Sequence, residues 1–253
     1  MRNIKLVIEY DGTNYQGWQK QPKLLTISGI LEEKLSKLIS EKIKLIGASR
    51  TDSGVHSFAQ VANFKAESNL PDKVFLKALN NILPPDIIIK NVQEVSLDFH
   101  SRFNAKSKTY KYFILNSKEK SVFSRNKLYY FSHKLNLALI QKAIKFLKGK
   151  HDFTSFCSTG SYTSTNVRTI TNFTVKTCVG KLSFIPIQKY IVFTITGSGF
   201  LRKMIRNIIG TLIKVGTEEL TPADVKNILK NRNRKKAFPP APACGLYLAK
   251  IEY

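Results

Sequence analysis

Apolar and polar positions repeat with a period that changes along the chain, and the period predicts the local structure. Ile191, Phe193 and Ile195 alternate with more polar neighbours, which is typical of a half-buried strand. Over residues 200–215 the apolar positions recur every three to four residues, as on one face of a helix. The same pattern predicts further helices at 28–40, 72–82, 135–148 and from Thr221, and strands at 3–10, 42–49, 58–65, 87–96, 107–115, 127–132, 168–178, 182–197 and 244–253.

Most of these predicted strands follow one another without a helix long enough to form a crossover. Parallel strands need such a crossover, whereas antiparallel strands do not. The order of elements therefore predicts an α+β fold with mostly antiparallel sheets. We expect two similar α+β halves, residues 1–104 and residues 105–253.

Positive charge is concentrated in the second half. The chain has 41 Lys and Arg residues against 17 Asp and Glu residues, a net charge of +24. Residues 1–104 carry 14 basic and 11 acidic side chains, and residues 105–253 carry 27 and 6. An AT-rich genome would enrich lysine in both halves alike, so it explains this asymmetry poorly. The asymmetry instead favours a polyanionic partner, of which nucleic acid is the usual one.

Several classes of protein are not indicated. No window of 18 residues is free of charge, and Glu9 interrupts the first apolar run, so we expect neither a membrane span nor a secretory signal. The three cysteines are far apart without a C-x-x-C pair, and the four histidines lack metal-ligand spacing, so we expect reduced cytoplasmic cysteines and no metal. The glycine-rich phosphate loops are absent from the sequence, so no nucleotide cofactor is indicated.

Residues 47–56 carry the strongest candidate chemistry. Arg50 and Asp52 are two positions apart, so in an extended backbone they project to the same face. Arg50 can then keep the Asp52 carboxylate ionised and oriented as a nucleophile or base. The residues alone favour a simpler alternative, an Asx-turn with a surface ion pair that contributes at most about 1 kcal/mol. His56 follows the turn, where a histidine is more often packed or capping than catalytic.

Residues 47–64, GASRTDSGVHSFAQVANF, resemble the catalytic motif of the TruA family of tRNA pseudouridine synthases. The resemblance extends in order over essentially the whole chain. Its other motifs are YDGTNYQGWQKQP at 10–22, LPPDI at 83–87, FHSRFNAKSKTYKYFI at 99–114, HDFTSFC at 151–157, NVRTI at 166–170, GSGFLRKMIRNIIGTL at 197–212 and APACGLYL at 241–248. Mild departures from the family pattern occur at Ser28, Ser57, Ala59 and Ser101.

The resemblance assigns roles by position. Asp52 corresponds to the essential aspartate and Arg50 to its ion-pair partner. Tyr110 corresponds to the tyrosine that stacks on the target base, and Arg206 to an active-site arginine. Leu246 matches a residue that lines the pocket. The resemblance also implies the pseudouridine synthase fold, with a catalytic cleft between the two halves.

The family's reaction isomerises uridine to pseudouridine at positions 38, 39 and 40 of the tRNA anticodon arm. It needs no cofactor, and family members act as homodimers on one tRNA. The aspartate either attacks the ribose C1′ or abstracts the 2′ proton, and the sequence leaves both routes open. The target base must be flipped out of its stem, and an aromatic ring such as that of Tyr110 can offset part of the cost.

Two alternatives from other classes remain. A tRNA-binding protein that has lost catalysis would not need Arg50, Asp52, Tyr110 and Arg206 intact. A carboxylate-based nucleoside glycosidase would normally use a second carboxylate, and none is apparent near Asp52.

Basic residues near the C-terminal end of the second half are candidates for phosphate contacts. A solvated loop is the alternative for the run at 232–236. The candidates are Arg202, Lys203, Arg232, Arg234, Lys235 and Lys236.

Overall fold

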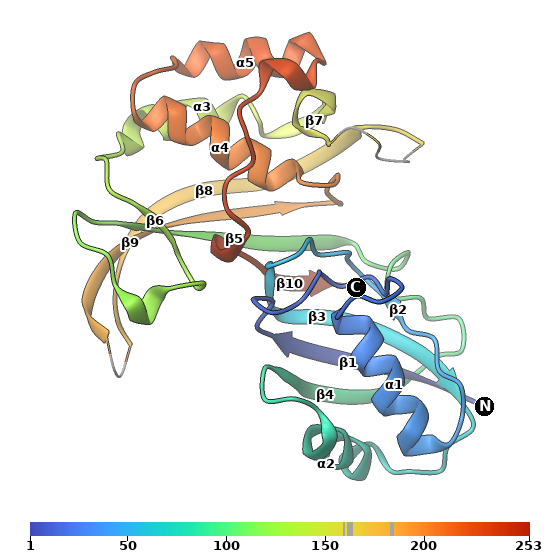
Figure 1. Ribbon diagram of the computed structural model, residues 1–253. Coiled ribbons are helices and arrows are strands. Elements are labelled where there is room, and N and C mark those ends of the chain that lie inside the picture. Colours follow the sequence, from blue (N-terminus) through green and yellow to red (C-terminus); the bar gives the residue numbers. More distant parts are fainter. Residues whose placement is uncertain (159, 161–163, 183–184) are drawn as a thin grey trace. The chain divides into compact units, whose positions relative to one another are not determined.

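The computed structural model describes residues 1–158, 160, 164–182 and 185–253, which form two compact units (Figure 1). The first unit contains Met1–Lys108 and Tyr247–Tyr253, and the second contains Thr109–Leu246. The chain passes from the first unit to the second within β5 (Ser107–Asn116) and returns at the start of β10 (Leu246–Glu252). The sequence predicts a division after residue 104, with the last strand in the second half. The contacts in the structure group that strand with the first unit.

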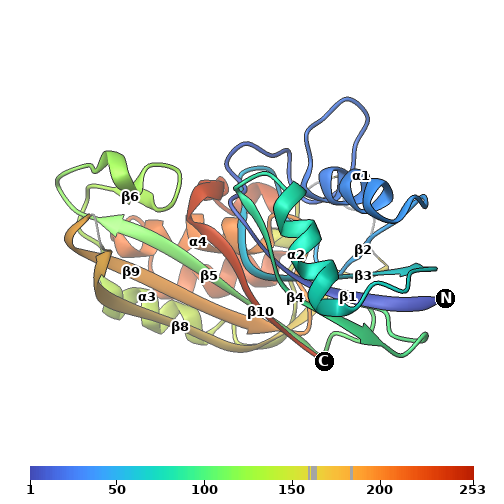
Figure 2. The same cartoon turned by 90° about the horizontal axis from the view of Figure 1, so that it is seen from below.

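The first unit is a mostly antiparallel sheet covered by helices on one face. Its strands are β1 (Arg2–Tyr10), β2 (Ile46–Gly47), β3 (His56–Ala66), β4 (Ile87–Val95) and β10. The order is β4-β1-β3-β10, with β1 antiparallel to both β4 and β3, and β10 parallel to β3. Helices α1 (Ile27–Ile39) and α2 (Asp72–Ile82) lie on the same face of this sheet (Figures 1 and 2).

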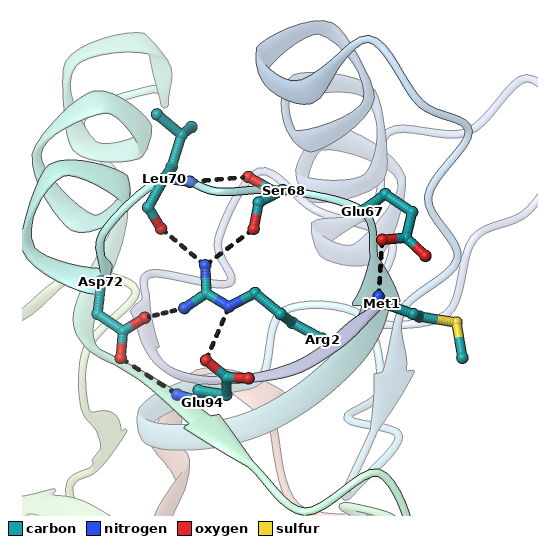
Figure 3. A network of polar contacts seen from close by, with 7 residues as sticks. All are labelled: Met1, Arg2, Glu67, Ser68, Leu70, Asp72 and Glu94. Atoms are coloured by element: carbon teal, nitrogen blue, oxygen red, sulfur yellow. Dashed lines mark hydrogen bonds and ion pairs between the residues drawn. The ribbon is translucent and has the colours of Figure 1, made fainter.

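Arg2 fastens two strands and a helix of the first unit together (Figure 3). Its guanidinium donates to Glu94 Oε2 on β4 at 2.8 Å and to Asp72 Oδ1 at the start of α2 at 2.9 Å. It also donates to the carbonyls of Ser68 and Leu70, in the connection before α2. One side chain on β1 therefore fixes how β4 and α2 meet at this end of the sheet.

The second unit contains the strands β5, β6 (Tyr129–Phe131), β7 (Gly149–Asp152), β8 (Val167–Leu182) and β9 (Ile185–Gly197). Their order is β5-β9-β8-β7, with β8 antiparallel to β9 and β7, while β6 pairs in parallel with β5. Helices α3 (Leu137–Lys145), α4 (Met204–Gly216) and α5 (Pro222–Asn231) pack together on one face of these strands (Figure 1). Short 3-10 turns lie at Val122–Ser124, Thr154–Phe156, Arg234–Lys236 and Ala243–Gly245.

The fold class predicted from the sequence, α+β with mostly antiparallel sheets, is confirmed. The helices and most strands lie within a few residues of their predicted positions. The strand predicted at 42–49 is wrong except at Ile46–Gly47. At Ile43 and Leu45, side chains of α1 take the place of a neighbouring strand. Ser36 Oγ accepts from the Ile43 amide, and Glu32 Oε1 accepts from the Leu45 amide.

Two further differences concern the second unit. Strand β7 was not predicted, because its sequence Gly-Lys-His-Asp has no alternating apolar pattern, yet it pairs with β8 along its length. The strand predicted at 182–197 includes residues 183 and 184, which lie outside the described residues, and β9 begins at Ile185.

Candidate active site

Asp52 lies in a tight turn between β2 and β3. The Val55 amide donates to the Asp52 carbonyl at 3.2 Å, and the Gly54 amide donates to the Tyr15 carbonyl at 3.3 Å. Gly54 has a φ of 74°, in the left-handed region that favours glycine. The turn therefore places a partly buried carboxylate on a backbone with a fixed path.

Residues 10–18 pack their own backbone against this turn. A Cβ atom on Gly12 would lie 2.0 Å from the Val55 carbonyl oxygen, and one on Gly17 would lie 2.5 Å from the Thr51 carbonyl oxygen. Only glycine permits these approaches. The Tyr10 hydroxyl lies 2.7 Å from Thr51 Oγ1 in the interior. The spacing of glycines in the 10–22 motif is thus explained by the support that it gives to the Asp52 turn.

The segment that leads from β2 to Asp52 is held from both sides. The buried Gln60 amide donates to the Ser49 carbonyl at 2.8 Å and accepts from the Ser49 amide at 3.2 Å. Lys108 Nζ donates to the carbonyl of Ala48. Burial, with a further contribution from Arg102, lowers the pKa of Lys108 to about 8. Neither the bonds of Gln60 nor that of Lys108 involves the Asp52 carboxylate.

His56 is a packed residue, 1% exposed, at the start of β3. Its Nδ1 lies 2.9 Å from Asp11 Oδ1 and 3.1 Å from the Gly12 amide nitrogen. Its ring stacks on Tyr247 of β10, with ring centroids 4.5 Å apart. His56 thereby links the 10–22 motif and β10 to the strand that follows Asp52.

The Arg50 side chain is exposed. Its role as the partner of the aspartate, which the resemblance implies, stays a prediction.

In the second unit, Tyr110 lies on β5 and is 6% exposed. Its ring meets the Phe200 ring edge to face, with centroids 5.3 Å apart and an interplanar angle of 84°. Such aromatic pairs contribute about 0.5–1.5 kcal/mol beyond the area that they bury. The ring of Tyr110 is therefore held in one orientation by a neighbour on the β9–α4 connection.

Arg206, in the first turn of α4, is bonded to the proline-rich segment before β10. Its Nε donates to the Ala241 carbonyl at 2.7 Å, and the Ala241 amide donates back to the Arg206 carbonyl at 2.9 Å. A Cβ on Gly210, one turn further along α4, would lie 2.1 Å from the Pro239 carbonyl oxygen. Leu246, the first residue of β10, is buried.

The site residues predicted from the sequence fall into two groups. Arg50 and Asp52 belong to the first unit, and Tyr110, Arg206 and Leu246 belong to the second. The contacts described above hold the Asp52 turn in the first unit, and Tyr110 and Arg206 in the second. The cleft expected between the two halves stays a prediction.

The basic run at 232–236 is not uniformly available to a ligand. Arg234 is partly buried, and its guanidinium donates to Asn207 Oδ1 at 3.0 Å and to the carbonyls of Ala237 and Phe238. Lys235 and Lys236 are exposed. Arg234 therefore braces the 3-10 turn on which the two lysines lie.

In the described part of the chain, no set of three or more His, Cys, Asp and Glu side chains is arranged to hold a metal ion. No helix among the described residues is long and apolar enough to span a bilayer.

The supporting residues Gly12, Gln60 and Lys108 had no role assigned from the sequence. Gln60 offered a signal, since an uncharged polar side chain stands among apolar ones in a strand that is buried on both faces. The partner of Lys108 lies 60 residues earlier in the chain, so no local pattern identifies it.

Comparison with known proteins identifies relatives over the full chain. A family model described as tRNA pseudouridine synthase matches residues 6–104 and 143–253. Proteins named tRNA pseudouridine synthase A are 46% identical in Clostridium acetobutylicum, 47% in Acetivibrio thermocellus and 46% in Caldicellulosiruptor saccharolyticus. Each of these alignments spans 253 residues and covers 100% of both chains.

Proposed function

Since the chain belongs to the tRNA pseudouridine synthase family, we propose that it converts uridine to pseudouridine at positions 38, 39 and 40 of the tRNA anticodon arm. The observation that carries this proposal is the turn that bears Asp52, which keeps the family's motif and is held in place by contacts from Gly12, Gly17 and Gln60. A carboxylate that must meet one carbon or one proton of a ribose needs such a fixed support, because a misplacement of about 1 Å can cost on the order of a hundredfold in rate.

The proposed reaction exchanges one bond to the ribose for another. The C1′–N1 bond breaks, the uracil turns, and a C1′–C5 bond forms. C5 then loses its proton, and N1 gains one, so the reaction has no net oxidation and needs no co-reactant. Asp52 acts at the ribose, by attack on C1′ or by removal of the 2′ proton.

The remaining site residues position the substrate. Tyr110 stacks on the flipped uracil with a ring that Phe200 already orients. Arg206 and Arg50 supply positive charge near the reacting carboxylate, and Leu246 contributes apolar surface to the pocket. The positive charge of residues 105–253 attracts the tRNA backbone.

We also propose that the protein works as a homodimer in the cytoplasm. The family resemblance supports the dimer. The three cysteines, all in the described residues, form no disulfide, which suits a reducing compartment. Sedimentation of the protein alone and with tRNA tests the dimer.

The test of the activity is tritium release from tRNA that carries uridine labelled at carbon 5. We expect release by the wild type, none by Asp52→Asn or Asp52→Ala, and tRNA binding retained in both variants. Free uracil among the products would instead identify a glycosidase, and tRNA binding without release by the wild type would identify an inactive binding protein.

Arg50→Lys gives a second test of the site. Lysine keeps the charge but loses the planar fork that binds a carboxylate in two places. We expect turnover to fall more than tRNA affinity. Wild-type turnover in Arg50→Lys would show that Arg50 is only a surface cation.

A further inference from the structure

The motif at 99–114 contains an exposed aromatic side chain that the proposed chemistry does not use. Phe103 is 74% exposed, although it belongs to a well-formed turn. The Arg102 guanidinium lies over its ring, 5.5 Å from the centroid, and the His100 ring lies 4.3 Å from it. We call residues 100–104 the Phe103 turn.

Hydrogen bonds within the Phe103 turn fix its shape. His100 Nδ1 accepts from the amides of Arg102 at 3.2 Å and Phe103 at 3.3 Å. Asn104 closes the turn in both directions, because its side chain accepts from the His100 amide at 2.6 Å and its own amide donates to the His100 carbonyl. The exposed ring therefore extends from a preorganised backbone.

Buried polar side chains anchor the Phe103 turn to the sheet of the first unit. Ser101 is 0% exposed, its amide donates to Asn63 Oδ1 at 2.9 Å, and its hydroxyl donates to the Ile46 carbonyl. Asn63 in turn donates to Asn3 Oδ1 at 2.9 Å, and Asn3 donates to the carbonyl of Phe99. Buried polar groups cost stability unless they are hydrogen-bonded, so this network fixes the turn firmly while leaving Phe103 outside.

The same contacts place the Phe103 turn beside the segment that leads to Asp52. Ile46, which bonds Ser101, lies in β2, directly before that segment. Arg102 is close enough to Lys108 to help lower the pKa of Lys108, and Lys108 is bonded to the Ala48 carbonyl. All of these residues lie in the first unit.

The sequence next to Phe103 is basic. Residues 102–106 contain Arg102 and Lys106, both exposed, and no acidic residue. An exposed ring beside a guanidinium offers a base a stacking surface and its phosphate a cation. This pairing of groups fits single-stranded nucleic acid.

We propose that Phe103 and Arg102 form a stacking site for a tRNA nucleotide other than the one that is isomerised. The proposal rests on the proposed function for its ligand. A nucleotide near the target stacks on Phe103 while Arg102 contacts its phosphate. The site thereby holds the loop of the RNA open beside the segment that leads to Asp52.

The experiment measures binding of an unmodified tRNA transcript to Phe103 variants of the full chain. Stacking of one base is worth roughly 1–3 kcal/mol, so Phe103→Ala should weaken binding by about 5- to 150-fold. Phe103→Trp should bind like the wild type, and Phe103→Leu should lose nearly as much as Phe103→Ala. Leu97→Ala, a nearby exposed apolar residue at 47%, is the matched control and should bind normally.

The outcomes separate the possible roles. Because the ring is exposed, all variants should keep the wild-type melting temperature. Wild-type affinity in Phe103→Ala, or in Phe103→Leu, would overturn the stacking site. A change in sedimentation of the RNA-free protein with no change in affinity would show that Phe103 contacts a second copy of the chain, which also overturns it.

The binding comparison does not depend on turnover and is repeated in the Asp52→Asn background. If the wild type releases no tritium, the proposed function fails, while the affinities of the Phe103 variants still decide the stacking site. If the wild type is active and all affinities are equal, only the stacking site fails.

Discussion

The turn that carries Asp52 and the first turn of α4, which carries Arg206, are held in place by different means. Around Asp52 the contacts come from neighbours such as Gly12, Gln60 and Lys108. They hold the backbone of the turn and of the segment before it. Arg206 instead uses its own guanidinium to hold the Ala241 carbonyl. A substitution at Asp52 therefore changes the carboxylate while these backbone contacts remain. A substitution at Arg206 also removes a bond that holds the segment before β10.

Among substitutions that leave the carboxylate in place, the largest effect is expected from Gly12→Ala, which displaces the Asp52 turn. The new Cβ would lie 2.0 Å from the Val55 carbonyl oxygen, so the turn must shift. We expect the single-turnover rate on tRNA to fall on the order of a hundredfold. Gly199→Ala is the matched control, since nothing lies within 4 Å of its Cβ position. Wild-type turnover in Gly12→Ala would show that the turn tolerates displacement.

The second prediction compares stability at the two positions. Arg206→Gln removes the bond to the Ala241 carbonyl, which lies in a buried residue, and an unsatisfied buried acceptor costs about 1–3 kcal/mol. For a chain of this size, each kcal/mol corresponds to about 2–4 °C in melting temperature. Calorimetry should show this loss in Arg206→Gln and a smaller change in Asp52→Asn. Equal losses of melting temperature in the two variants would show that the Asp52 and Arg206 side chains contribute alike to stability.

The third prediction uses the pKa of Lys108, which is lowered to about 8 in the folded chain. Between pH 8 and the ordinary lysine pKa of 10.5, the unfolded chain binds this proton and the folded chain does not. The free energy of unfolding should therefore rise with pH over that window, by on the order of 2 kcal/mol from this group. Urea unfolding at several pH values should show a rise that Lys108→Met lacks. The same pH dependence in both proteins would contradict a buried, neutral lysine.

The smallest effect is expected at the basic run. Lys235 and Lys236 are exposed, so replacing both by Gln should weaken tRNA binding a few-fold and reduce the slope of log affinity against log salt by up to about 2. Arg234→Gln, which breaks the bonds to Asn207 and Phe238, should lower the melting temperature. An unchanged salt slope in the double variant would leave 235 and 236 as solvated charges.

Local periodicity was sufficient to predict most of the helices and strands, because each amphipathic segment buries one face against its own unit. It failed where a side chain replaces a strand partner, as Ser36 and Glu32 of α1 do for Ile43 and Leu45. A pattern of hydrophobic positions does not show which side chains will form hydrogen bonds of this kind.

The candidate site was located by its motif, whereas its support was not. The role of Gln60 depends on a bond to Ser49 that forms only when β3 lies beside the segment after β2. Charge patterning likewise treated Arg234 as equivalent to Lys235. The difference arises from Asn207, 27 residues earlier, which accepts from the Arg234 guanidinium.

The return of the chain to the first unit has a consequence for synthesis on the ribosome. Strand β10 pairs with β3 at Tyr247 and Leu248, opposite His56 and Ser57, a few residues after Asp52. Domains generally fold as units as they emerge during translation. Here the unit that holds Asp52 must wait for residues 247–253, which are translated only after the whole of the second unit. Nascent chains therefore expose the edge of β3 until late in translation, and the unit that carries Asp52 is complete only then.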